Sequence, residues 1–123
     1  MGIRVGGSSL AGQPRFFLLR GNLVAGTTSS VNNAYGIYSD NTNAAIILEN
    51  AVSGTTAVST SYNSYGVRVA SGTFNRITDN HVVGSGKAND VGIQSASGTD
   101  ACHDNFLRDS TTTIGCDAAL GNF

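Results

Sequence analysis

The chain has 123 residues, 16 of them glycine, and a formal net charge of −1. Only 12% of the residues are charged, which excludes the basic surface that attracts nucleic acids or anionic membranes. Ser (14), Asn (12) and Thr (12) are also frequent, but the apolar fraction of 40% is too high for a disordered polar tract. No segment approaches the roughly 20 apolar residues of a membrane span, and MGIRVGGSSLAG lacks the apolar core of a signal peptide. We therefore expect a soluble, folded chain whose compartment the sequence does not specify.

A glycine followed by a β-branched residue recurs along the chain and marks four short strands. The four pairs are Gly2-Ile3, Gly36-Ile37, Gly66-Val67 and Gly92-Ile93. Between them the apolar residues follow a period of two or form short runs, and no window carries the spacing of an amphipathic helix. The sequence therefore predicts an all-β chain.

A second landmark is an asparagine that recurs at a nearly constant interval. It comprises Asn22, Asn50 and Asn80, with Asp109 as the fourth member. Three positions before each of these stands a large apolar residue: Leu19, Ile47, Ile77 and Phe106. Two positions after the first three stands a valine: Val24, Val52 and Val82.

Repeats of roughly 29 residues with two or three short strands each predict a parallel β-solenoid. We expect about four coils and a single domain covering residues 1–123. Equivalent residues of successive coils would stack about 4.8 Å apart, so the apolar positions would form core columns. Asparagine tolerates a left-handed backbone and bonds neighbouring backbone groups, so the asparagines are expected to form corners between strands.

The segments RFFLLRGNLVAG, AAIILENAVSG and NRITDNHVVGSG resemble the right-handed parallel β-helix repeats of the pectate-lyase-like superfold. That group includes phage tailspikes and many carbohydrate-active proteins. The resemblance extends from Gly2 to about Gly115 and implies the architecture; it does not specify an activity, because one fold carries many functions. Since tailspike-like β-helices associate as parallel trimers, the resemblance also implies a homotrimer.

The alternation of side chains along the strands predicts an outward apolar band of Phe16, Leu18, Ile46 and Leu48. Such a band marks an interface, and we expect it to be buried between copies of the chain. A long loop folded over the band is the alternative. The open ends of the solenoid would be covered either by oligomerisation or by further coils of a longer β-helix.

Glu49 and Asp79 each stand directly before the repeated asparagine, so they are expected on adjacent coils about 5 Å apart. Arg108 is expected at the same position of the next coil. Two carboxylates at this separation suit the acid and nucleophile of a retaining glycosidase, and they could equally hold calcium. The alternative is a solvated charge ladder that contributes little.

Tyr35 and Tyr65 both precede the repeated glycine, and Arg4, Tyr38, Arg68 and Gln94 form an expected outward column. Flat rings beside hydrogen-bonding side chains suit a sugar, and we assign binding to Tyr35, Tyr38, Tyr65 and Arg68, together with Arg108. Alternatively, stacked tyrosines only stabilise neighbouring strands.

Cys102 and Cys116 both belong to the last repeat and could lock the last coil as a disulfide. Two cysteines without a secretion signal more often stay reduced, so the sequence leaves their redox state open. No catalytic signature, cofactor loop or metal-ligand spacing is recognisable in the chain. We therefore expect a non-catalytic trimeric β-helix module, tailspike-like, with a structural or glycan-binding role and no cofactor. The alternative is a polysaccharide lyase or glycoside hydrolase that acts in a surface groove.

Overall fold

The computed structural model describes residues 1–6, 16–110 and 115–116, and all its paired strands run parallel. Three sheets have four strands each. The first contains β1 (Ile3–Gly6), β5 (Ala34–Asp40), β10 (Ser64–Val69) and β14 (Asp90–Ser95). The second contains β2 (Leu18–Arg20), β7 (Ile46–Leu48), β12 (Arg76–Thr78) and β15 (Ala101–His103), and the third contains β3 (Leu23–Ala25), β8 (Ala51–Ser53), β13 (His81–Val83) and β16 (Phe106–Arg108). Two short pairs, β6 (Thr42–Asn43) with β11 (Gly72–Thr73) and β4 (Thr28–Ser29) with β9 (Thr56–Ala57), complete the coils.

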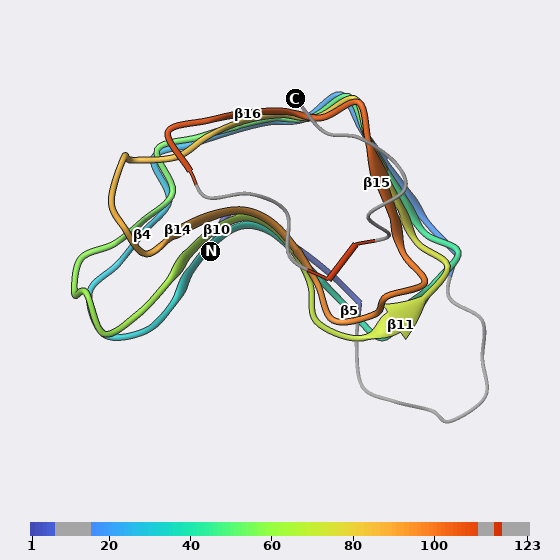
Figure 1. The fold of residues 1–123 in the computed structure, drawn as a ribbon, viewed down its shortest axis with the longest axis horizontal. Coiled ribbons are helices and arrows are strands. Elements are labelled where there is room, and N and C mark those ends of the chain that lie inside the picture. Colours follow the sequence, from blue (N-terminus) through green and yellow to red (C-terminus); the bar gives the residue numbers. More distant parts are fainter. Residues whose placement is uncertain (7–15, 111–114, 117–123) are drawn as a thin grey trace.

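The strands stack as the coils of a solenoid, which confirms the expected β-helix. Seen down the stack, successive coils lie over one another, and the first sheet bows toward the third (Figure 1). The outer surface of the first sheet is therefore concave. No helix occurs among the described residues.

Inward-facing residues form three apolar columns, one from each main sheet. Strand pairing aligns Ile3, Ile37, Val67 and Ile93 in the first sheet, and Leu19, Ile47, Ile77 and Cys102 in the second. The third column is Val24, Val52, Val82 and Leu107. The central members of all three columns are fully or almost fully buried, and together they form the core.

The last coil differs in register from the sequence prediction. Ile77 pairs with Cys102 and His81 pairs with Phe106, so Asn105 and not Asp109 continues the asparagine column. Phe106, which we expected in the core, is 49% exposed. The fourth coil is shorter than the others, because Asn105 follows Asn80 by 25 residues. A constant interval from Asn80 leads to Asp109 instead, which is why the predicted register was wrong.

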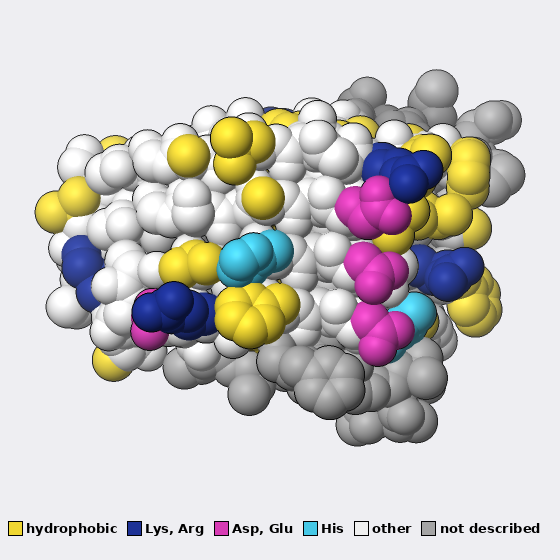
Figure 2. Space-filling model, turned by 90° about the horizontal axis from the view of Figure 1, so that it is seen from above, with side chains coloured by type: hydrophobic (Ala, Val, Ile, Leu, Met, Phe, Trp, Pro, Cys, Tyr) yellow, Lys and Arg dark blue, Asp and Glu magenta, His cyan; other side chains and the backbone are white. Residues whose placement is uncertain are grey.

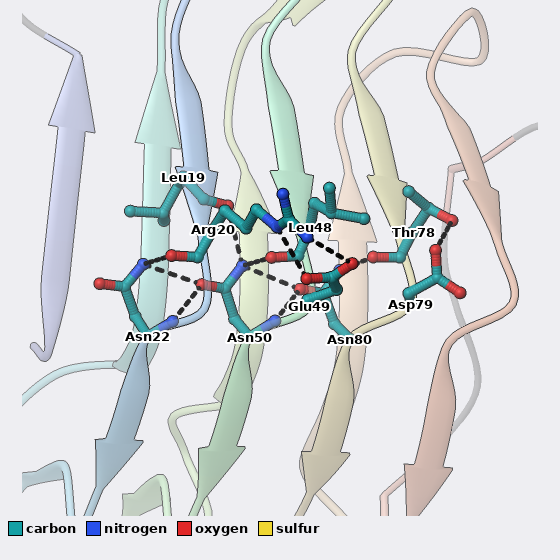
Figure 3. A network of polar contacts seen from close by, with 9 residues as sticks. All are labelled: Leu19, Arg20, Asn22, Leu48, Glu49, Asn50, Thr78, Asp79 and Asn80. Atoms are coloured by element: carbon teal, nitrogen blue, oxygen red, sulfur yellow. Dashed lines mark hydrogen bonds and ion pairs between the residues drawn. The ribbon is translucent and has the colours of Figure 1, made fainter.

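The asparagine column forms a continuous amide ladder at the corner between the second and third sheets (Figure 3). Oδ1 of Asn80 accepts both the backbone N–H of Asn50 at 3.0 Å and its Nδ2 at 2.9 Å. Nδ2 of Asn80 in turn donates to the carbonyl oxygens of Ile47 and Thr78, each at 2.9 Å. The buried amide of Asn80 is thus paired at both its oxygen and its nitrogen, which is the condition for burying an amide without loss of stability.

The residue before each asparagine adopts the left-handed backbone that turns the corner. Its φ is 66° at Gly21, 53° at Glu49 and Asp79, and 55° at Asp104. Only the first of these is a glycine, so three acidic residues are held in a conformation that glycine adopts without steric cost.

The repeated glycine brings the first sheet close to the valine column. A Cβ atom at Gly36 would collide with Cγ1 of Val52 and would lie 2.6 Å from the carbonyl oxygen of Gly66. Gly66 meets Val82 in the same way. A side chain at this position would push the first sheet away from the third, which explains why a glycine precedes the core residue in these coils.

Cys102 and Cys116 form a disulfide, one of the two states that the sequence left open. Cys102 is fully buried in the core and Cys116 packs against that core, so the bond joins the fourth coil to the residues that follow it.

We predict that Asn80→Ala lowers the free energy of unfolding by about 3 kcal/mol, because it removes the bonds that Oδ1 of Asn80 accepts from Asn50 and the bonds that its Nδ2 donates to the carbonyls of Ile47 and Thr78. Urea denaturation followed by circular dichroism measures this change. Asn22→Ala is the matched control, since among the described residues Asn22 has a neighbouring asparagine on one side only, and it is expected to cost about 1 kcal/mol. Equal losses at the two positions would contradict a ladder that depends on stacking from both sides.

We also predict that reduction of the disulfide lowers the free energy of unfolding by about 3 kcal/mol, the entropic effect of opening a loop of this length. The bond closes a sequence separation of 14. Thermal melts with and without dithiothreitol measure the effect. A Cys116→Ser variant should melt at the same temperature in both conditions, and a difference there would assign the effect of the reductant to another cause.

Candidate functional site

The concave outer surface of the first sheet carries a cluster of aromatic and basic side chains, here called the tyrosine–arginine face. Strand pairing places Tyr35 beside Tyr65, and it aligns the remaining members in one column, as the sequence predicts. The members of the face are Arg4, Tyr35, Tyr38, Tyr65, Arg68 and Gln94.

The rings of this face stack across the coils. The ring centroids of Tyr35 and Tyr65 are 5.4 Å apart with an interplanar angle of 9°. The guanidinium carbon of Arg68 lies 4.7 Å from the ring centroid of Tyr65 and 5.7 Å from that of Tyr35. Arg4 lies in the same way over Tyr38, at 5.6 Å. Both arginines are thus held by cation–π contacts.

Asparagine side chains orient the phenol groups. Nδ2 of Asn33 donates to the hydroxyl of Tyr35 at 3.2 Å, and Nδ2 of Asn63 donates to the hydroxyl of Tyr65 at 3.0 Å. In both contacts the hydroxyl acts as the acceptor. A phenol group that accepts one bond can still donate its own hydrogen to a further partner.

The members of the face differ in what they can offer a ligand. Tyr65 is only 4% exposed, so it supports the neighbouring groups, whereas Tyr35 and Tyr38 are half-buried and Arg4 is exposed. Nε of Arg68 is buried without a hydrogen-bond partner in the described part of the chain. None of the ion pairs among the described residues includes Arg4 or Arg68. The face therefore presents aromatic edges together with guanidinium groups that no described carboxylate neutralises.

A second group of polar residues lies at the asparagine corner. The acidic side chains there form a row across the coils (Figure 2), and the left-handed corner positions assign them as Glu49, Asp79 and Asp104. Each has a different partner. Arg20 binds Glu49 with 2.7 Å between Nε and Oε2, and Thr78 donates to Asp79 at 3.1 Å. Nδ1 of the adjacent histidine lies 2.8 Å from Oδ2 of Asp104.

The Arg20–Glu49 pair is a solvent-exposed contact. The hydrogen bond from Arg20 to Glu49, followed by the charge of that carboxylate, raises the pKa of the Arg20 guanidinium above its ordinary value. Both side chains are about half exposed. Water therefore screens the pair, and it contributes little to stability.

The predicted catalytic residues are neighbours, but their expected partner is elsewhere. Glu49 and Asp79 occupy the same corner position on adjacent coils. Arg108 was expected to follow them; instead it pairs with Val83 in the third sheet and contacts Asp109 at 3.3 Å. Asp104 takes the third place in the row. We missed Asp104 because the constant interval leads to Asp109 and not to Asn105. The catalytic and binding roles of these residues stay predictions.

One protein family matches almost the whole chain. The family is described as periplasmic copper-binding protein (NosD), and its model matches residues 4–122. The chain belongs to the NosD family. This match and the stacked parallel sheets confirm the right-handed parallel β-helix, while the narrower pectate-lyase-like assignment is not confirmed. No curated protein and no solved structure matches the chain. Within the described residues, no helix is long and apolar enough to cross a membrane.

The copper named in the description of the NosD family does not fit the side chains of this member. The whole sequence offers two histidines, two cysteines and one methionine, and both cysteines are in the disulfide. His103 faces Thr78 and Asp104 with Nδ1, and the ring of His81 packs edge-on against Phe106 at 4.7 Å. In the described ranges, no three His, Cys, Asp or Glu residues lie together as a metal site would require. The calcium alternative for Glu49 and Asp79 is likewise not confirmed.

The members of the predicted apolar band on the second sheet differ in exposure. Phe16 is 67% exposed and Leu18 is 55% exposed, whereas Ile46 and Leu48 are half-buried. Phe74, at a corner two positions before β12, is 68% exposed and adds to the apolar surface at the edge of this sheet. The sequence signal for Phe74 was weak, because it lies at a corner and outside the strand alternation.

Proposed function

We propose that this NosD family member is a non-catalytic β-helix module that binds carbohydrate through the tyrosine–arginine face. The observation that carries the proposal is the pair of guanidinium groups held over tyrosine rings on a concave sheet surface, with no carboxylate paired to them among the described residues. A sugar ring has an apolar face and a rim of hydroxyls, so it matches aromatic edges next to hydrogen-bond donors. The uncompensated charge favours sugars that also carry an acidic group.

The rigidity of the face supports a binding role. Tyr35, Tyr38 and Arg68 project from the long strands β5 and β10, and Asn33 and Asn63 orient two of the phenol groups. Side chains whose positions are set before a ligand arrives lose little conformational entropy on binding.

The hydrolase or lyase alternative, with Glu49 and Asp79 as catalytic residues, has less support. Glu49 is bound to Arg20 and about half exposed. The corner that carries both residues is a convex turn of the coil (Figure 1), whereas acid–base catalysis on a polysaccharide benefits from a site that excludes water.

We further propose that the module is a trimer and acts in the periplasm. The exposed Phe16, Leu18 and Phe74 supply the kind of apolar surface that soluble monomers seldom leave open. The NosD family is described as periplasmic, and a disulfide persists in such an oxidising compartment.

We expect the chain to bind soluble acidic polysaccharides, and Arg68→Ala to weaken that binding at least tenfold, about 1.4 kcal/mol. Isothermal titration against a panel of acidic and neutral polysaccharides measures the affinity. Lys87→Ala is the matched control, because Lys87 is an exposed basic residue outside the tyrosine–arginine face, and it should bind like the unchanged chain. Absence of binding across the panel, or equal affinity of the two variants, would refute the assignment.

We expect the purified chain to have three times its monomer mass at micromolar concentration, and Leu18→Glu to reduce it to the monomer. The added charge would be buried without a partner in the interface. Light scattering coupled to size exclusion gives the mass. Val58→Glu changes another exposed apolar residue, outside the apolar band, and should remain trimeric. A monomeric unchanged chain would overturn the trimer.

A further inference from the structure

The three main sheets all end in unpaired strand edges on the same side of the stack. In the strand order of the described residues, β1, β2 and β3 each have a neighbour on one side only. This side is called the N-terminal end below. The edge of a parallel sheet carries N–H and C=O groups in position to pair with another strand.

The core columns also reach the N-terminal end without cover from the described residues. Ile3 and Leu19 are half-buried, whereas Ile37 and Ile47, their neighbours in the second coil, are fully buried. A hollow opens at this end; residues 1–3 line one side of it, and residues 23–28 line the other. Among the described residues, the N-terminal end therefore exposes the apolar inner side of the first coil.

In the amide ladder each asparagine donates to the asparagine of the next coil. The first asparagine, at the N-terminal end, therefore presents its amide oxygen as an acceptor. Each later asparagine accepts two bonds at Oδ1 from the asparagine of the preceding coil, as Asn50 does from Asn22 at 3.0 and 2.9 Å. Asn22 is the first of the row. Its amide oxygen points away from Asn50, and no contact to it is drawn among the residues shown (Figure 3). The group that fits here is a backbone N–H together with a side-chain amide, which is what an asparagine of one more coil would supply.

The opposite end of the stack is built differently. Cys116 is joined to Cys102 and packs against the core, and a Cβ atom at Gly115 would collide with the carbonyl oxygen of Ser95. Gly115 and Cys116 thus cover part of that end. A second copy of this chain would offer a partly covered edge there, which argues against head-to-tail stacking of copies.

We propose that the N-terminal end is a docking surface for one further parallel β-helix coil that is not part of residues 1–123. Strands of that coil would pair with β1, β2 and β3. An asparagine at its corner would donate its backbone N–H and Nδ2 to Oδ1 of Asn22. The partner is thus defined by its chemistry: a coil with an apolar inner face and an asparagine at this corner.

Particular amide groups report such docking. In the second coil, the N–H of Ile46 donates to the carbonyl of Phe17 and that of Ala51 to the carbonyl of Asn22, both at 2.9 Å. Leu18 and Leu23 occupy the same positions in the first coil. Their N–H groups would donate to the docked coil.

The experiment supplies the coil by fusion. A copy of residues 35–64 is joined directly before Met1 of the full chain, so that Met1 and Gly2 follow the copy as Tyr65 and Gly66 follow the original segment. Hydrogen exchange followed by NMR then measures the amides of Leu18 and Leu23. We expect their exchange to slow at least tenfold relative to the unfused chain. We expect the protection to be lost when the copied Asn50 alone is replaced by leucine.

Two results would overturn the proposal. Exchange at Leu18 and Leu23 that is unchanged by the fusion would mean that the end does not accept a coil, whether or not the added residues fold. Equal protection by the asparagine and leucine versions would mean that Asn22 does not specify its partner. The amides of Ile46 and Ala51 serve as the internal control, since both are already bonded and should remain protected throughout.

Discussion

The amide ladder at the corner between the second and third sheets is the interaction on which the rest of the structure depends. Successive asparagines pair with one another and with carbonyl groups of the turn, so four coils share one register. A shift of one coil by a single residue would break these bonds and turn the adjacent core residues outward. The ladder therefore aligns the three apolar columns and, with them, every outward-facing column of the solenoid.

Regular spacing made much of this fold predictable from the sequence. The asparagines at positions 22, 50 and 80 and the glycine–β-branched pairs predicted the correct columns in the first three coils. In the fourth coil Ile93 was placed correctly. Its strands in the second and third sheets were not, because the coil is shorter and Asp109 stands at the expected interval. The sequence named the Cys102–Cys116 disulfide as possible but could not decide whether it forms, since the two cysteines meet only after the chain has passed beyond the fourth coil.

The outward-facing surfaces follow from the same stacking. Alternation along the strands predicted which residues of the tyrosine–arginine face point outward, and the structure adds the cation–π contacts and the asparagines that hold the phenol groups. The chain belongs to the NosD family, which is described as periplasmic and copper-binding, yet the two histidines of this member lie on separate sheets. The description of the NosD family as copper-binding therefore does not by itself assign a copper site to this chain.

Gly36 and Gly66 of the first sheet face the core, yet they also affect the shape of the outer surface of that sheet. Because Gly36 and Gly66 lack a Cβ atom, the sheet can press against Val52 and Val82, and this close approach accompanies its inward bow. The depth of the concave outer surface therefore depends on the glycines that face the core. A substitution at one of these glycines would be invisible from solvent, yet it would flatten the surface that carries the tyrosines and arginines.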